Sequence, residues 1–168
     1  AFIHQELSLF KNLDIATNIY IQNLPQNGPA LATQKMMDDT REILKKVSLE
    51  HCSPRQKVSE LKIGEQQLVE IGRTLAQNTK ILILDEPTSS LTNSEIKILF
   101  DIVRRLQKEG VAVIFITHRM DEIYEICTSL MVMRDGERIL KCPIDKISRT
   151  EVIHQMLGRN MEEQYAHR

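Results

Sequence analysis

Two apolar segments stand out in the second half of the chain, at 81–84 and 111–117. Neither alternates with polar residues, and such segments are typical of strands buried on both faces of a parallel sheet. Between them, Thr92 and Glu95 form the T-x-x-E pattern of a capping box, which begins a helix. Apolar residues then recur at helical spacing as far as Gly110, where the helix ends. This order predicts an α/β fold with a mostly parallel sheet.

The remaining pattern is mainly helical, above all in the first 80 residues. Helices are predicted over 33–47, 64–77, 121–127 and 151–157. Thr150 is the expected cap of the last helix, and Gly158 lies beyond its end. Gly72, on the apolar face of the 64–77 helix, predicts close approach by another backbone.

Shorter segments complete the outline. Residues 1–6 resemble the end of a strand, and proline, asparagine and glycine make 23–29 rich in loops. Arg134-Asp135-Gly136 predicts a hairpin turn between strands at 129–133 and 137–141.

Composition excludes several classes of protein. The chain has 22 lysines and arginines against 23 acidic residues, and a net charge of -1 argues against nucleic-acid binding by bulk phosphate attraction. Its three cysteines form no C-x-x-C pair, as expected in a reducing compartment and not in a disulfide scaffold or zinc site. No apolar run approaches the length of about 18 residues that a membrane span needs.

The strongest candidate for chemistry is the acidic pair Asp85-Glu86, which directly follows the strand at 81–84. Ligands of open α/β sheets bind at the carboxyl ends of the strands. An aspartate there can hold Mg²⁺ through water, and a glutamate can orient or deprotonate a water that attacks a γ-phosphate. An ordinary strand that ends in a polar turn is the alternative.

Two weaker signals accompany this pair. His118 follows the second predicted strand, so it reaches the same edge of the sheet and can bond a phosphate oxygen. Residues 61–67 begin a helix, and a helix amino terminus favours anions. A solvated loop histidine and a plain helix start are the alternatives.

Together these residues resemble the ATP-binding cassette (ABC) ATPases. In the order of that family, Gln5 resembles the Q-loop glutamine and 61–65 the signature motif, which is usually Leu-Ser-Gly-Gly-Gln. Walker B corresponds to 81–86, the D-loop to 89–92, and the switch histidine to His118. The segments 3–7, 63–71, 117–123 and 158–159 resemble the ribose, galactose and xylose import ATPases of bacteria, whose subunits carry two cassettes.

The resemblance implies a P-loop NTPase fold of ABC type with a helical subdomain. It divides the chain into 1–80, with the Q-loop, helical and signature regions, and 81–168, with the remaining motifs. It implies catalytic roles for Glu86 and His118. The implied nucleotide-binding residues are Gln5, Lys62, Ile63, Gly64, Glu65, Asp85 and Ser90. Asp85 and Gln5 are the implied Mg²⁺ residues, mainly through water.

The resemblance also implies ATP and Mg²⁺ as cofactors, a second cassette, transmembrane permease subunits, and indirectly a sugar-binding protein as partners. No nucleic-acid partner is expected. The implied location is the cytoplasmic face of the cell membrane, and the implied function is ATP-driven sugar import. A non-transport soluble ABC ATPase and a non-hydrolysing regulatory cassette are the alternatives.

Two departures from the family pattern matter. The 168 residues contain no G-x-x-x-x-G-K-[ST] phosphate loop, so we expect an amino-terminally truncated first cassette that neither binds nor hydrolyses ATP alone. Lys62 stands where the signature serine is usual, which predicts either a degenerate site or a cationic substitute. Ile63, Glu65 and Thr92 are milder departures.

Overall fold

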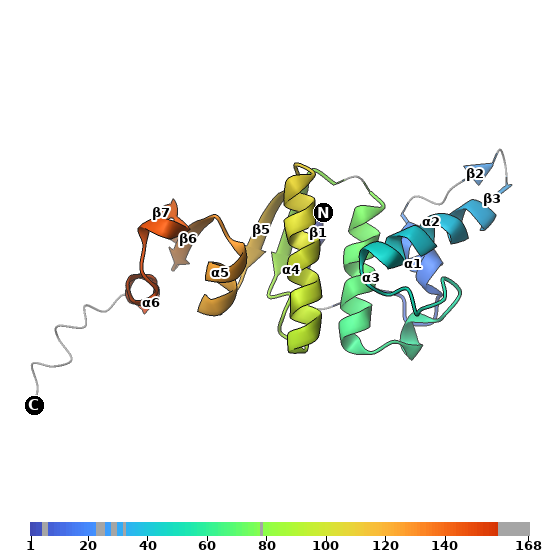
Figure 1. Cartoon of the computed structure of the whole chain (residues 1–168), viewed down its shortest axis with the longest axis horizontal. Coiled ribbons are helices and arrows are strands. Elements are labelled where there is room, and N and C mark those ends of the chain that lie inside the picture. The colour runs from blue at the N-terminus through green and yellow to red at the C-terminus, as the bar shows by residue number, and fades with distance from the viewer. Residues whose placement is uncertain (5–6, 23–25, 28–29, 32, 78, 158–168) are drawn as a thin grey trace, which may run out of the picture. The chain divides into compact units, whose positions relative to one another are not determined.

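A computed structural model describes residues 1–4, 7–22, 26–27, 30–31, 33–77 and 79–157. The chain forms two compact units, Ala1–Ile116 and Thr117–Arg168, and each is described by itself (Figure 1). The division by motif content at residue 80 is a different one and stays a prediction. Across the described residues, no helix combines the length and apolar character needed to cross a bilayer.

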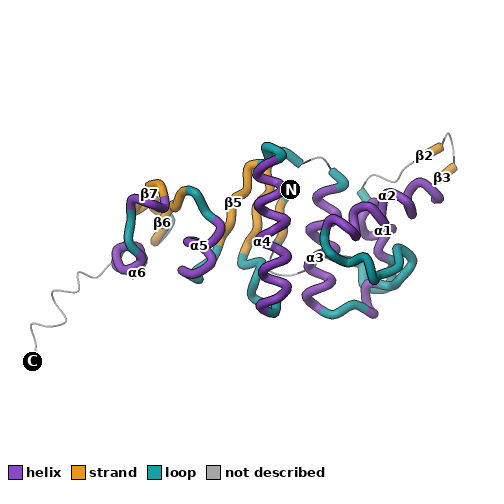
Figure 2. Tube along the Cα trace, viewed as in Figure 1, coloured by secondary structure: helices purple, strands orange, loops and turns teal. Residues whose placement is uncertain are grey.

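The first unit contains a three-stranded parallel sheet. Strands β1 (Phe2–Ile3), β4 (Ile81–Asp85) and β5 (Ala112–Ile116) lie in the order β1-β4-β5. The register pairs Ile83 with Phe2 on one side and with Ile114 on the other. These strands confirm the parallel sheet that the apolar segments predict (Figure 2).

Helix α4 (Asn93–Lys108) packs against one face of this sheet. Its apolar residues recur at helical spacing, and Leu99, Phe100 and Val103 are buried. The Phe100 and Phe115 rings meet edge to face with their centroids 6.1 Å apart. The reciprocal capping box of Thr92 and Glu95 begins this helix, as the sequence predicts.

The other face of the sheet is open within the described residues. Ile114 is 50% exposed and Ile116 is 45% exposed, and Phe2 and Ile81 are also exposed. The prediction that both strands are buried on both faces is therefore wrong for the described structure. Along each strand, residues that face α4 alternate with residues that face the open side. Both sets are apolar, so the segments contain no polar alternation although one face of the sheet is exposed.

Three further helices, a 3-10 turn and a short strand pair belong to the rest of the first unit. Helices α1 (Ile15–Tyr20), α2 (Thr33–Lys46) and α3 (Ile63–Leu75) contact one another, and a 3-10 turn spans Val58–Glu60. The loop-rich stretch 23–29 contains strand β2 (Gln26–Asn27), which pairs with β3 (Ala30–Leu31). Its other residues lie outside the described part of the chain. The helices predicted over 33–47 and 64–77 are confirmed to within two residues.

Gly72 of α3 lies close to another element, as predicted, but its neighbour differs from the one expected. A Cβ at Gly72 would lie 2.9 Å from the Ile43 Cγ2 atom and within 4 Å of Val47. The close approach therefore comes from side chains at the end of α2 and not from a backbone. Gly72 allows the two helices to pack closely at this point.

The second unit is a hairpin packed with two helices. Strand β6 (Ser129–Arg134) pairs antiparallel with β7 (Glu137–Pro143), and Asp135 and Gly136 form the turn with φ of 52° and 81°. The predicted hairpin is confirmed, and positive φ at both positions suits a two-residue turn. Arg134, which the prediction included in the turn, instead ends β6 and pairs with Glu137. Buried residues of this core lie in α5 (Met120–Ile126), β6 and α6 (Arg149–Leu157). A short 3-10 turn spans Ile144–Lys146.

The start of α6 differs from the prediction. The helix begins at Arg149, and the Ser148 Oγ accepts a hydrogen bond from the Glu151 N–H at 3.2 Å. Ser148 therefore takes the capping role expected of Thr150, because the helix begins two residues earlier than predicted. Gly158 lies outside the described residues.

Candidate functional site

The acidic pair Asp85-Glu86 lies at the carboxyl end of β4, as predicted. Both side chains are partly buried. The Glu86 N–H donates to the Ile116 carbonyl at the end of β5, at 2.9 Å, and the Ser89 N–H donates to the Glu86 carbonyl at 3.2 Å. The two strand ends are thus tied together at the residue that carries the second carboxylate.

Glu86 has a left-handed backbone, with φ of 45°. A residue with a Cβ adopts this conformation at a cost of about 1 kcal/mol or more. The hydrogen bonds on either side of Glu86 hold it there. Backbone strain of this kind is common at functional sites, where it sets the direction of a side chain.

The N-cap and first turn of α3 carry four of the five signature residues, 62–65. Lys62 is the N-cap and is exposed, and Ile63 is also exposed. The Lys62 N–H donates to Glu65 Oε2 at 2.9 Å, but the lysine side chain has no acceptor to return the bond. Only one half of a capping box therefore forms at the signature.

Glu65 also contacts a neighbouring loop. Its Oε1 lies 2.9 Å from His51 Nε2. The hydrogen bond from His51 is the main cause that lowers the pKa of the Glu65 carboxyl below its ordinary value of 4.5, and the bond from Lys62 N–H acts in the same direction. Glu65 therefore stays ionised beside the positive end of α3.

Gly64 brings the signature next to the start of α4. A Cβ at Gly64 would lie 2.1 Å from Glu95 Oε1, so any larger residue would displace that side chain. The other Glu95 oxygen accepts from the Thr92 N–H at 2.7 Å. The signature and the D-loop helix therefore meet through Gly64, and Ser90 is exposed on the adjacent turn.

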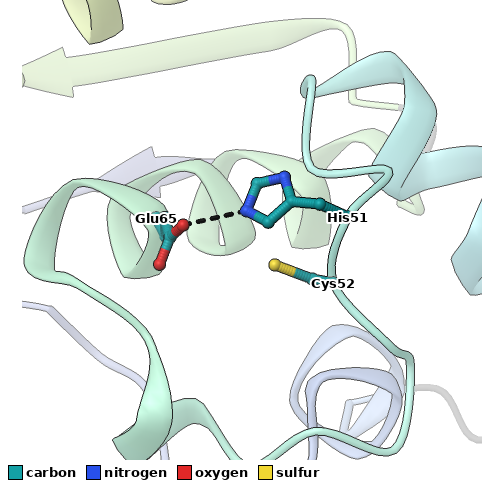
Figure 3. A group of neighbouring side chains, drawn as sticks. All are labelled: His51, Cys52 and Glu65. Carbon is teal, nitrogen blue, oxygen red and sulfur yellow. Dashed lines mark hydrogen bonds and ion pairs between the residues drawn. The ribbon is translucent and has the colours of Figure 1, made fainter.

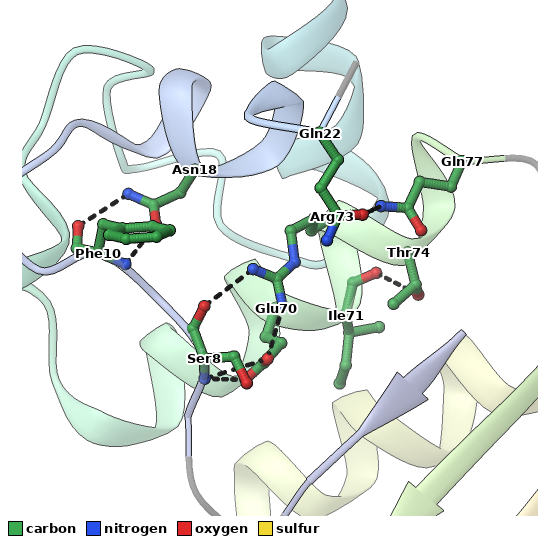
Figure 4. A network of polar contacts seen from close by, with 9 residues as sticks. All are labelled: Ser8, Phe10, Asn18, Gln22, Glu70, Ile71, Arg73, Thr74 and Gln77. Atoms are coloured by element: carbon green, nitrogen blue, oxygen red, sulfur yellow. Dashed lines mark hydrogen bonds and ion pairs between the residues drawn. The ribbon is translucent and has the colours of Figure 1, made fainter. Parts of the chain in front are cut away.

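A polar network anchors the segment that follows Gln5 (Figure 4). Gln5 itself lies outside the described residues. Glu70 and Arg73 of α3 form an ion pair at 2.8 Å, with side chains 1% and 11% exposed. Glu70 accepts from the Ser8 N–H at 3.2 Å, and Arg73 donates to the Ser8 carbonyl at 2.9 Å. Both polar groups of the Ser8 backbone are therefore held by α3.

The same segment is held a second time by Asn18 of α1. Its side chain is fully buried, accepts from the Phe10 N–H at 2.7 Å and donates to the Phe10 carbonyl at 3.0 Å. Sequence analysis missed both anchors. For Asn18, the available signal was a polar residue within the apolar run of α1. Glu70 offered no such signal, because its neighbours at helical spacing are also polar.

His118 lies in the second unit, in the exposed segment after β5. Next to it, Thr117 Oγ1 donates to Glu122 Oε2 at 3.0 Å and accepts from the Arg119 N–H at 3.1 Å. Arg119 also pairs with the buried Glu122 carboxylate at 2.7 Å. These contacts fix the backbone on both sides of His118 to the first turn of α5.

The matched part of the chain contains the acids at the end of β4, the start of α3 and the segment after Gln5. A family model described as ABC transporter matches residues 1–89, which is more than half of the chain. The chain belongs to the ABC transporter family. This confirms the resemblance drawn from the motifs.

Two curated relatives of this ABC chain have names that specify a substrate. This chain is 41% identical over 163 residues to the galactose/methyl galactoside import ATP-binding protein MglA 1 of Photobacterium profundum. The match covers 96% of this chain and 33% of that protein. The chain is 39% identical over 170 residues to the ribose import ATP-binding protein RbsA of Bacillus cereus, covering 100% and 34%. The chain spans about a third of the length of these relatives.

Solved structures show the same cassette fold. An inward-facing ABC transporter of metal-chelate type matches with a TM-score of 0.76 and 19% identity, over 94% of this chain and 63% of that chain. A dimeric post-hydrolysis ATP-binding cassette bound to ADP and Pi matches with a TM-score of 0.73 and 24% identity, over 85% and 62%. The predicted α/β fold of ABC type is confirmed.

Proposed function

We propose that the protein containing this chain is the ATP-binding subunit of a bacterial monosaccharide importer, which couples ATP hydrolysis to sugar entry. The import names of the relatives support this proposal. Ribose, galactose or xylose is the expected class of substrate. The observation that carries the proposal is the carboxylate pair at the end of β4, where two hydrogen bonds hold the backbone of Glu86.

Glu86 is the proposed general base. Its carboxylate lies one residue beyond the strand, and its backbone is held by the bond to the Ile116 carbonyl and by its left-handed conformation. A positioned carboxylate at this place can accept a proton from the attacking water as the γ-phosphate is transferred. The fixed backbone sets the direction in which the Glu86 side chain leaves the chain.

Asp85 is the proposed Mg²⁺ residue, with Gln5 as its proposed partner. A partly buried carboxylate at an open strand end suits Mg²⁺, which prefers oxygen ligands and keeps several waters. When bound, Mg²⁺ neutralises charge on the phosphates. Asp85 would hold the ion or its waters, and the structure assigns no geometry to Gln5.

The remaining motif residues would contact nucleotide at a paired site. His118 would bond the γ-phosphate, and Ser90 would approach it from the D-loop. Signature residues 62–65 would face the nucleotide of a second cassette, with Lys62 as a cation in place of the usual hydroxyl. The exposure of Lys62, Ile63 and Ser90 supports a surface that closes against a partner.

The proposed partners and location follow from import. The cassette would lie on the cytoplasmic face of the membrane, seated on permease subunits near the segment that follows Gln5. The double anchoring of Ser8 and Phe10 supports this role, because a rigid segment can transmit movement to α3. A periplasmic or extracellular sugar-binding protein would deliver the substrate.

The proposal is tested with Glu86→Gln in the intact protein. We expect ATP hydrolysis to fall by about a hundredfold or more while ATP binding persists, because the amide keeps the size of the side chain and loses the base. Steady-state phosphate release and retained nucleotide are the measurements. Glu109→Gln, at an exposed position after α4, is the matched control and should leave both unchanged.

An uptake assay distinguishes the importer from the two alternatives, a non-transport ATPase and a regulatory cassette. If the importer proposal holds, vesicles containing the intact transporter take up one of the three sugars with ATP, and Glu86→Gln abolishes that uptake. Hydrolysis without uptake of any sugar would favour a non-transport ATPase. ATP binding without hydrolysis in the native protein would favour a regulatory cassette.

A further inference from the structure

Three potential metal ligands come together at the start of α3 (Figure 3). His51 and Cys52 lie in the loop between α2 and the Val58–Glu60 turn, and Glu65 lies in the first turn of α3. One ligand atom of each residue lies within 4.8 Å of the ligand atoms of the other two. Cysteine spacing does not indicate this group, because only one of its members is a cysteine.

The loop that carries His51 and Cys52 has a defined backbone. The Leu49 N–H donates to the Leu44 carbonyl at 2.8 Å, and the Cys52 N–H donates to the Leu49 carbonyl at 3.0 Å. Farther along, the Gln56 N–H donates to the Ser53 carbonyl at 2.9 Å. The two neighbouring ligands are therefore presented by an ordered loop.

The dimensions suit a tetrahedral ion with an open position. Zn²⁺ binds sulfur at about 2.3 Å and nitrogen or oxygen at about 2.1 Å, so its tetrahedral ligands lie about 3.5 Å apart. No separation in the group exceeds 4.8 Å, so its atoms need to approach by at most about 1.3 Å to reach that spacing. His51 Nε2 and Glu65 Oε1, which are 2.9 Å apart, would move slightly apart to admit the ion. His51 is 61% exposed and free to make this movement, and its exposure leaves room for water as a fourth ligand.

Charge and hydrogen bonding are also compatible with a bound dication. A Cys52 thiolate and the Glu65 carboxylate balance the two charges of the ion, and His51 binds as a neutral imidazole. Glu65 Oε1 faces His51, whereas Oε2 accepts from the Lys62 N–H. One carboxylate can therefore bind an ion through one oxygen and keep its helix-capping bond through the other.

We propose that His51, Cys52 and Glu65 form a binding site for a divalent metal ion that prefers sulfur ligands, such as Zn²⁺. On binding, a metal–sulfur bond forms as the S–H bond of Cys52 breaks, and the proton passes to solvent. The ion would join the loop after α2 to the first turn of α3. The site does not depend on the proposed transport function.

Co²⁺ titration of the full chain tests the proposal, with a phosphine reductant and no added thiol. We expect one equivalent of Co²⁺ to give a thiolate-to-cobalt absorption band and visible bands of tetrahedral Co²⁺, and Zn²⁺ to remove them. Cys52→Ala should abolish the thiolate band. Cys127→Ala and Cys142→Ala are the matched controls and should retain it, because neither thiol belongs to the group.

Two further variants keep the test independent of folding. His51→Ala changes an exposed side chain, and Glu65→Gln keeps an oxygen that can accept from Lys62 N–H. Each should weaken Zn²⁺ binding by at least about a hundredfold, because loss of a partner that only orients a ligand already costs about tenfold to a hundredfold. Each variant should still show a cooperative unfolding transition. The proposal is overturned if no thiolate band forms, or if the band survives Cys52→Ala or is lost in either control.

Discussion

At the scale of single residues, the buried pair of Glu70 and Arg73 has the largest predicted effect on stability. Burial is the main cause that raises the pKa of the Glu70 carboxyl, and the Arg73 charge opposes it. Arg73→Met would leave the carboxylate buried without its cation, and we expect a loss of about 3 kcal/mol in the free energy of unfolding at neutral pH. Chemical denaturation measures this loss.

The pH dependence of that variant has a defined sign. A raised pKa means that folded Glu70 binds a proton more readily than the unfolded chain does, so stability of Arg73→Met rises as pH falls through the folded pKa. Arg41→Met, which breaks an exposed pair with Asp38, is the control and should change stability by less than about 0.5 kcal/mol. An equal effect of the two variants would contradict the role of burial.

At the scale of elements, the half-formed capping box of α3 can be completed. Lys62 has the extended backbone of an N-cap, with φ of -65° and ψ of 157°. Lys62→Ser would supply an acceptor for the Glu65 N–H, as Thr92 does for Glu95 in α4. We expect a gain of about 1 kcal/mol in the free energy of unfolding.

Thermal or chemical denaturation of the Lys62→Ser variant gives the measurement. Lys11→Ser removes an exposed lysine that is not the N-cap of a helix, since Asp14 caps α1, so it controls for the loss of charge. A gain shared by both variants, or absent from Lys62→Ser, would contradict the capping explanation.

The elements that the sequence predicts correctly depend on local chemistry. The capping box before α4, the turn at Asp135-Gly136 and the acids that end β4 each require only a few neighbouring residues. Those that it misses depend on contacts distant in sequence. Helix α1 is short and is stabilised by the buried Asn18, and the His51, Cys52 and Glu65 group forms only after the loop folds onto α3.

The distinction between local and distant contacts also explains why the strand-end site could be predicted and the burial of the strands could not. The register that places Asp85 beside Ile116 follows from strand order, so the strand-end site could be predicted. Which face of β5 is covered depends on the packing of α4, which an apolar run cannot specify. The roles of Ser90, His118 and Gln5 rest on the family resemblance and stay predictions.

At the scale of the whole molecule, the open face of the sheet predicts a surface property of the chain. Phe2, Ile81, Ile114 and Ile116 together present apolar side chains beyond the isolated ones that are normal on a surface. We expect anilinonaphthalene sulfonate to bind with increased fluorescence, and Ile114→Thr with Ile116→Thr to reduce that signal while strand propensity is kept.

A control for this measurement lies in the hairpin of the second unit. Met133 is exposed to a similar degree, but it belongs to a different sheet. Met133→Thr should leave the fluorescence nearly unchanged. If it lowers the signal as much as the paired isoleucine substitutions do, the dye binds elsewhere and the open face does not explain it.

The left-handed backbone of Glu86 has a consequence for how this position can vary. Glycine adopts that conformation without a steric penalty, so selection for stability alone would favour it there. A glycine would fold well and carry no base. If Glu86 has the proposed role, retention of glutamate is an evolutionary compromise, and stabilising screens that ignore turnover would select inactive proteins at this position.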